Sequence, residues 1–265
     1  MTAPADQWTD LKARMVPGLM LVVIGVIGIW LGGHAFHFMV ALICALMVWE
    51  LVGMLRPGAS WEQLLLGGLA GAAVLCGSYL PIGFALPILL LPALYGFARL
   101  EDHRTDYMNF AVMITLAGFG MIAVRDTLGV SWMLWLVLVV VATDVVGYFA
   151  GRFFGGPKFW PKVSPKKTWS GTVAGWVAAG CIGALGMVVL EASAELIGIS
   201  VAVSMASQMG DIAESGMKRK MGVKDSSSLI PGHGGVMDRF DGMLGASLFL
   251  LVTGPIINFP PSLAG

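Results

Sequence analysis

The sequence has little charge and little cysteine. Charged residues make up 12% of its 265 positions, against roughly 25% in an ordinary soluble domain, and the mean hydropathy is +0.82. The formal net charge is zero, so no basic surplus indicates a nucleic-acid partner. The three cysteines lie far apart in apolar runs and form no CxxC or Cys/His group, which argues against a disulfide framework and a zinc site. This composition predicts an integral membrane protein.

The chain also lacks the marks of a nucleotide-binding fold and of a second domain. Its polar loops carry no Walker P-loop and no Rossmann fingerprint, and no internal repeat or composition shift divides the chain. Lys12 and Arg14 precede the first apolar stretch without a clear cleavage site, so we expect a retained span. We predict one integral membrane domain over residues 1–265, in which residues 1–130 form the N-terminal helices and residues 131–265 the motif-bearing catalytic half.

Apolar stretches of about the 20 residues that a bilayer requires recur along the chain. They predict an all-α fold, a polytopic membrane helix bundle of about nine transmembrane helices with cytoplasmic catalytic loops. The expected spans are residues 16–31, 36–55, 63–79, 82–98, 108–124, 131–151, 172–190, 195–209 and 243–259.

The basic residues test this count independently. With nine spans, all of the 16 Lys and Arg residues except Arg125 fall on one side of the membrane. A miscounted span would have scrambled this sorting. The basic side is expected to be cytoplasmic, which places the N-terminus in the cytoplasm and the C-terminus on the opposite side of the cell (inner) membrane.

Four ionisable residues lie in or near apolar spans, where burial is expensive and function is the default hypothesis. Glu50 lies beside Arg56, and an interfacial ion pair between them is the plainer interpretation. Asp144 is open to a similar interpretation, a structural pair with a nearby cation. Asp211 and Glu214 are three residues apart and therefore share a helical face.

A second pair of carboxylates, Asp238 and Asp241, is again three residues apart, where the last span begins. The two pairs bracket a loop rich in Lys, Ser, His and Gly. Carboxylates that converge at a membrane surface suit a hard divalent ion, and Mg²⁺ is favoured because it binds one or two carboxylates together with substrate phosphates. A solvated loop of ordinary salt bridges is the alternative.

The loop between these pairs contains IPGHGG, residues 230–235. Its glycines allow backbone N–H groups to face an anion, and His233 could donate to a phosphate or a leaving group, or stabilise the loop. The cations around this turn suit phosphoryl oxygens. They are Lys218, Arg219, Lys220, Lys224 and Arg239.

A second polar loop contains SPKKTWSG, residues 164–171. Lys166 and Lys167 precede an expected helix start at Thr168, where cations and helix N–H groups could hold polyphosphate or lipid headgroup oxygens. A polybasic patch attracted to anionic lipid is the competing interpretation.

The first of these loops carries a long, spaced pattern. Its elements are Ser215, Met217, Lys218 and Arg219, then Lys224 and Asp225, then Pro231, His233, Gly234 and Gly235, and finally Asp238, Arg239 and Asp241. This pattern resembles the signature of CDP-diacylglycerol synthases (phosphatidate cytidylyltransferases). The likeness extends to residues 143–155, 164–171 and 208–220, roughly the C-terminal half. Ser170 departs from it, because the family often has Glu or Gln there.

The resemblance implies transfer of a cytidylyl group from CTP to phosphatidic acid with Mg²⁺, giving CDP-diacylglycerol and pyrophosphate in phospholipid synthesis. It implies Asp211 and Asp238 as metal ligands. The residues expected to be catalytic are Asp211, Asp238, Asp241, Lys218, Arg219 and His233. Those expected to bind substrate are Asp144, Lys166, Lys167, Ser215, Lys224, Gly234, Gly235 and Arg239.

Two other functions fit some of these residues. An ion-coupled transporter would use the acidic residues of the spans, but transporters usually place such groups near the midplane, between two related halves. A CTP-dependent lipid kinase would share the cations and carboxylates but transfer the γ-phosphoryl group. The expected partners are CTP, phosphatidic acid and membrane lipids, with no nucleic acid, and the resemblance implies a homodimer.

Overall fold

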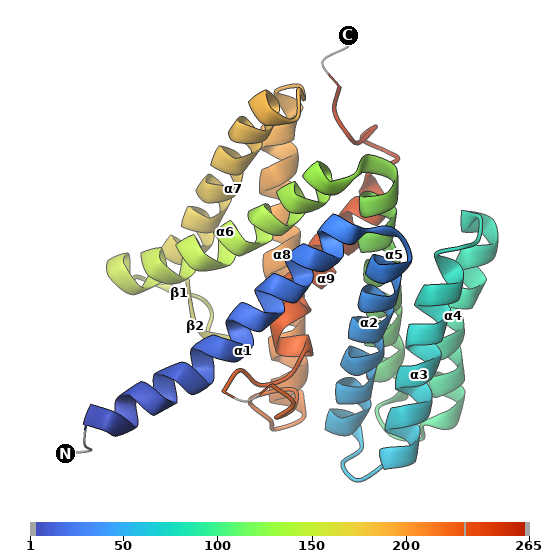
Figure 1. Ribbon diagram of the computed structural model, residues 1–265. Coiled ribbons are helices and arrows are strands. Elements are labelled where there is room, and N and C mark those ends of the chain that lie inside the picture. The colour runs from blue at the N-terminus through green and yellow to red at the C-terminus, as the bar shows by residue number, and fades with distance from the viewer. Residues whose placement is uncertain (1–3, 231, 263–265) are drawn as a thin grey trace.

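The fold is a bundle of helices with one small hairpin (Figure 1). The computed structural model describes residues 4–230 and 232–262, with side chains from residue 18 onward except at position 82. Within these residues the expected all-α membrane bundle is confirmed. The elements are α1 (Pro4–Leu31), α2 (Gly33–Leu55), α3 (Ser60–Gly77), α4 (Ile82–Arg99), α5 (Arg104–Leu128), α6 (Val130–Phe154), β1 (Lys158–Trp160), β2 (Ser164–Thr168), α7 (Trp169–Val189), α8 (Glu195–Lys220) and α9 (Met237–Thr253).

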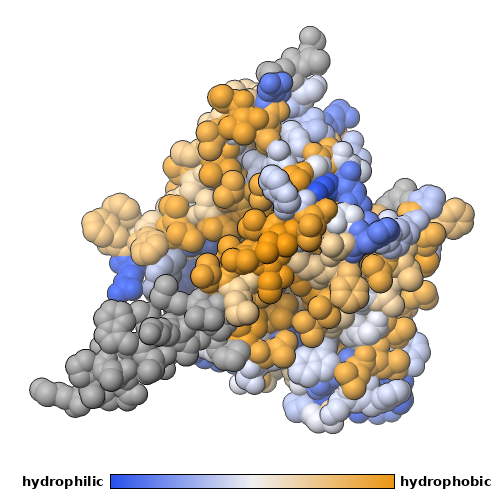
Figure 2. Space-filling model, viewed as in Figure 1, coloured by the Kyte–Doolittle hydropathy of each residue, from blue (hydrophilic) through white to orange (hydrophobic). Residues whose placement is uncertain are grey.

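Several helices have the length and apolar character that a bilayer requires. Among the described residues these are α2, α5, α6, α7 and α8, and α1 and α4 add shorter apolar segments. Large apolar side chains lie on the outside of the bundle, such as Leu138 on α6 and Val188 on α7, which is 79% exposed. Figure 2 shows apolar side chains over the middle of one face. A lipid environment explains this exposure, so the chain is a multi-pass membrane protein.

The ends of the last two helices differ from the expected spans. α8 continues to Lys220 instead of stopping near residue 209, because no proline interrupts it and its polar end is rich in good helix formers. α9 begins at Met237, six residues before the expected start, and ends at Thr253, ahead of Pro255. The carboxylates of both predicted pairs therefore lie on regular helix.

The β1–β2 hairpin was not expected. Its strands pair antiparallel, with Lys158 opposite Thr168 and Trp160 opposite Ser164. Val163 N–H donates to the Trp160 carbonyl at 3.2 Å, and Pro161 occupies the turn position at which proline's fixed φ is favourable. The hairpin leads directly into α7.

The helices form two groups that meet along α9. α2, α3, α4 and α5 pack side by side, and α6 to α9 form the second group, with α1 running across the front (Figure 1). α9 contacts α8 in its own group and also α5 and α2 in the other. α9 therefore connects the two groups of helices.

Glycines set the spacing between α8 and α9. A Cβ atom added at Gly245 would overlap the Ala206 carbonyl oxygen, and one at Gly210 would overlap the Asp241 carbonyl oxygen. A Cβ atom at Gly242 would lie 2.9 Å from Ser207 Oγ. Small residues allow helix backbones to approach this closely in a membrane, so α8 and α9 touch main chain to main chain.

We predict that Gly245→Ala destabilises the protein by about 1–3 kcal/mol, the usual cost of overpacking a close contact. Gly198→Ala on α8 is the matched control, since a Cβ atom there meets nothing within 4 Å and Ala favours helix over Gly by about 0.5–1 kcal/mol. Thermal unfolding in detergent measures both. Equal melting temperatures for the two variants would contradict the close packing.

Candidate functional site

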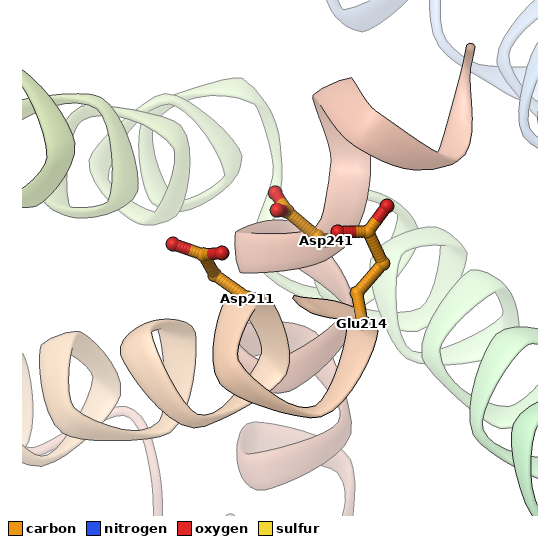
Figure 3. Close-up of side chains that lie close together, drawn as sticks. All are labelled: Asp211, Glu214 and Asp241. Carbon is orange, nitrogen blue, oxygen red and sulfur yellow. The ribbon is translucent and has the colours of Figure 1, made fainter. Parts of the chain in front are cut away.

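Three carboxylates meet where α8 and α9 cross. Asp211 and Glu214 come from α8, Asp241 comes from α9, and their side chains lie close together (Figure 3). One oxygen from each lies within 4.8 Å of the others, and Glu214 is fully buried. Such a set of oxygen donors fits a hard cation such as Mg²⁺. The predicted sharing of a helix face by Asp211 and Glu214 is confirmed.

Asp144 joins this region from α6. Its Oδ2 atom lies 3.6 Å from where a Cβ atom on Gly242 would be, one residue after Asp241. Asp144 and Asp211 also line the same cavity. Ser215 supports the group from α8, because its hydroxyl donates to Asp211 Oδ1 at 3.2 Å.

Two of the predicted phosphate-binding lysines are paired with these acids. Lys167 on β2 pairs with Asp211. Lys218 Nζ lies 2.7 Å from Glu214 Oε2 and 2.5 Å from Asp238 Oδ1. Buried charges are stable only when paired, so these lysines and acids hold one another in place.

Asp238 is turned toward the loop that precedes α9. Its Oδ2 atom accepts hydrogen bonds from Gly235 N–H at 2.7 Å and from both the N–H and the hydroxyl of Ser226 at 2.9 Å. Burial raises the pKa of Asp238, but the hydrogen bonds from Lys218, Gly235 and Ser226 outweigh it and lower the pKa to about 2. Among the described residues, Asp238 is not part of the three-carboxylate group.

The glycine-rich turn before α9 is closed by its own backbone. Ile230 N–H donates to the Gly234 carbonyl at 2.8 Å, and His233 N–H donates to the Ile230 carbonyl at 2.9 Å. Gly234 has φ of 82°, a conformation that other residues rarely adopt, and Pro231 lies outside the described residues. A Cβ atom at Gly235 would lie 2.5 Å from Glu50 Oε1, so this glycine is required by packing.

A cavity of about 550 Å³ opens beside this turn. Its lining includes the side chains of Lys224, His233 and Arg239 together with Gly234. It therefore combines a histidine and two cations, which suit phosphate oxygens, with one acid, Asp225, and the glycine backbone. Within the described residues, Arg219 is exposed and lines neither this cavity nor the next one.

A second cavity of about 620 Å³ lies between α6, α7, α8 and the hairpin. Thr168 caps α7, because its Oγ1 atom accepts a hydrogen bond from Gly171 N–H at 3.2 Å. This confirms the predicted helix start. The Ser170 hydroxyl donates a hydrogen bond to the Gly155 carbonyl. The charged residues that line the cavity are Asp144, Arg152, Lys158, Lys166, Lys167 and Asp211.

Glu50 has a different environment from the expected one. The predicted pair with Arg56 is wrong, because Arg56 lies 3.7 Å from Glu62 instead. Glu50 accepts hydrogen bonds from the loop before α9, from two serine hydroxyls and two backbone N–H groups. The position of Glu50 in an apolar helix indicated from the sequence that it has a specific role. Its partners could not be predicted, because they lie far away in the sequence.

Comparisons with known proteins agree with the family that the sequence pattern resembles. The cytidylyltransferase family matches residues 12–255 of this chain. A phosphatidate cytidylyltransferase of Brucella abortus is 33% identical over 269 aligned positions, covering 97% of both chains. The phosphatidate cytidylyltransferase of Bacillus subtilis is 28% identical, covering 91% of this chain and 96% of its own.

We predict that Lys218→Met lowers the free energy of unfolding by about 3–5 kcal/mol, because it strips a buried cation from two acids. The side chain of Lys218 is 14% exposed. Lys220→Met is the matched control: Lys220 pairs with Asp106 at 2.7 Å with 55% of its side chain exposed, and exposed pairs contribute only about 0–1 kcal/mol. Denaturant unfolding in detergent separates the two. A similar loss in both variants would mean that burial does not govern the Lys218 pairs.

Proposed function

Because the chain belongs to the cytidylyltransferase family, we propose that it transfers the cytidylyl group of CTP to phosphatidic acid. The products are CDP-diacylglycerol and pyrophosphate. The observation that carries this proposal is the meeting of three acidic side chains, from α8 and α9, one of which, Asp211, lines a cavity that also holds Arg152, Lys158, Lys166 and Lys167. Acids that could hold a divalent ion, next to cations that could bind phosphate, suit a transfer between two phosphate-bearing substrates.

The reaction joins one phosphate to another. An oxygen of the lipid phosphate bonds to the α-phosphorus of CTP, and the bond from that phosphorus to the oxygen bridging to the β-phosphate breaks. The attacking phosphate is already anionic near pH 7, so the step needs no strong base and no covalent nucleophile. The protein's contribution is in-line positioning and neutralisation of charge on the phosphates.

We propose Mg²⁺ as the cofactor, held by Asp211, Glu214 and Asp241. A bound divalent ion supplies positive charge to the reacting phosphate oxygens. The three carboxylates support this assignment because each offers an oxygen to one point. A ligand role for Asp238 remains a prediction. In this structure Asp238 accepts hydrogen bonds from Lys218 and from the loop before α9. It therefore supports the three carboxylates indirectly, through the pair that Lys218 makes with Glu214.

We assign one cavity to each substrate. The polar cavity beside the glycine turn would take the CTP polyphosphate, with Lys224, His233 and Arg239 as its donors. The cavity between α6 and the hairpin would take the lipid phosphate. Arg152 and Lys166 line it, and exposed apolar side chains such as Phe149 and Val173 flank it on α6 and α7. The lipid tails could then stay in the bilayer while the headgroup enters the site.

The sorting of basic residues supports an orientation for the chain. Both cavities are proposed to face the cytoplasm, with the N-terminus on that side and the C-terminus opposite, in the inner membrane. Accessibility of single cysteines placed at the two ends would reverse if this orientation were wrong. The proposed homodimer follows from family resemblance, and light scattering of the detergent-solubilised protein would contradict it by giving a monomer mass.

We predict that purified protein with Mg²⁺, phosphatidic acid and CTP labelled at the α-phosphate produces labelled lipid. Asp211→Asn should slow this about 10²-fold or more, the scale of losing a key electrostatic group. Asp106→Asn, which alters an exposed ion pair with Lys220, should retain the activity. Label that stays in water-soluble nucleotide with folded protein would exclude cytidylyl transfer, and lipid labelled from γ-labelled CTP would indicate a lipid kinase.

We further predict that the two cavities can be separated kinetically. Arg152→Met should raise the KM for phosphatidic acid and Lys224→Met the KM for CTP, each by roughly 10- to 100-fold. This is the range expected from one lost hydrogen bond to a charged group, about 1.5–3 kcal/mol. Each variant serves as the control for the other. Initial rates with either substrate varied test this, and a rise in the opposite KM would reverse the assignment.

A further inference from the structure

Glu50 is a buried acid that belongs to neither substrate cavity among the described residues. It lies near the end of α2, with 1% of the residue exposed. The donors that the structure gives it are neutral. Ser227 donates through its hydroxyl at 2.7 Å, and Val236 and Met237 donate through backbone N–H groups at 2.8 and 2.7 Å. The Ser226 hydroxyl lies 3.1 Å from Glu50 and shares its one proton between Glu50 and Asp238.

The two backbone donors are the N–H groups of Val236, which occupies the N-cap position of α9, and of Met237, the first residue of α9. Such groups have no acceptor within their own helix and carry partial positive charge, so they favour an anion. A helix usually obtains this acceptor from a polar residue at its own start. Here Val236 precedes the helix, and its apolar side chain accepts nothing. A carboxylate from α2 therefore caps α9.

Ser226 joins Glu50 to Asp238. Its hydroxyl lies 3.1 Å from Glu50 Oε2 and 2.9 Å from Asp238 Oδ2. The backbone N–H of Ser226 also donates to Asp238. The loop before α9 is thus held between two carboxylates, one from α2 and one from the first turn of α9.

The close packing of Gly235 supports the same arrangement independently. A Cβ atom at this position would lie 2.5 and 2.6 Å from the two oxygens of Glu50 and would overlap Ser226 Oγ. The carboxylate therefore lies directly against the backbone of the turn. Any side chain at position 235 would displace either the turn or Glu50.

We propose that Glu50 is a positioning residue that fixes the first turn of α9 and thereby places Asp241 against Asp211 and Glu214. Met237, whose N–H binds Glu50, is one helical turn before Asp241, so a shift of the helix start moves Asp241 with it. The expected effect of Glu50 on catalysis rests on the proposed function. Its expected effect on the order of the loop before α9 is independent of that function.

The test is Glu50→Gln, with Glu62→Gln as the matched control. Glutamine keeps the size of the side chain and one acceptor oxygen, but it turns an NH₂ group toward the N–H donors. We expect kcat to fall roughly 10- to 100-fold, as misplacement by about 1 Å can cause, with little change in either KM. Hydrogen exchange should accelerate over residues 226–238 and stay unchanged in α3. The control should alter neither, because Glu62 pairs with Arg56.

Unchanged kcat and unchanged exchange in a folded Glu50→Gln protein would overturn the proposal. A fall in kcat without faster exchange of the loop would also overturn it, since Glu50 would then act by another route. If Glu50→Gln does not fold, Ser227→Ala removes one donor to the same carboxylate and should show a smaller effect of the same kind. If the wild type transfers no cytidylyl group, the proposed function fails, and the exchange measurement still decides the role of Glu50.

Discussion

The main-chain contact between α8 and α9 is the constraint on which the site depends. Gly210 and Gly245 leave no room for a side chain between the two helices. Of the three carboxylates that meet in Figure 3, Asp211 and Glu214 lie one and four positions after Gly210, and Asp241 lies four positions before Gly245. A helix pair at ordinary spacing, about 8–10 Å between axes, would hold these oxygens further apart. The close approach of the three carboxylates therefore depends on glycine, which has no side chain, at positions 210 and 245.

Charge pairing is the second condition for this arrangement. The acids at the crossing of α8 and α9 come with lysines from two directions, Lys167 from the hairpin and Lys218 from α8 itself. Adjacent residues of a strand point to opposite faces, and Lys166 next to Lys167 is exposed. The hairpin thus gives Lys167 to the acids, while Lys166 remains exposed.

Much of the fold and part of the site were predictable from the sequence. Apolar length predicted the helices, and the three-residue spacing placed Asp211 and Glu214 on one face. The same spacing did not show that Asp238 and Asp241 turn to different partners, because that depends on Lys218 and on the loop. Pro161 marked the hairpin turn, but three- and five-residue strands are too short for a clear alternating pattern.

The partners of Glu50 could not have been read from spacing, since the last of them is 187 residues away. This separation also has a consequence in time. At a synthesis rate of roughly 5–20 residues per second, Met237 leaves the ribosome about 10 to 40 s after Glu50. Throughout that interval the carboxylate of α2 lacks the donors that satisfy it in the finished protein. The end of α2 reaches its final environment only when the start of α9 has been made.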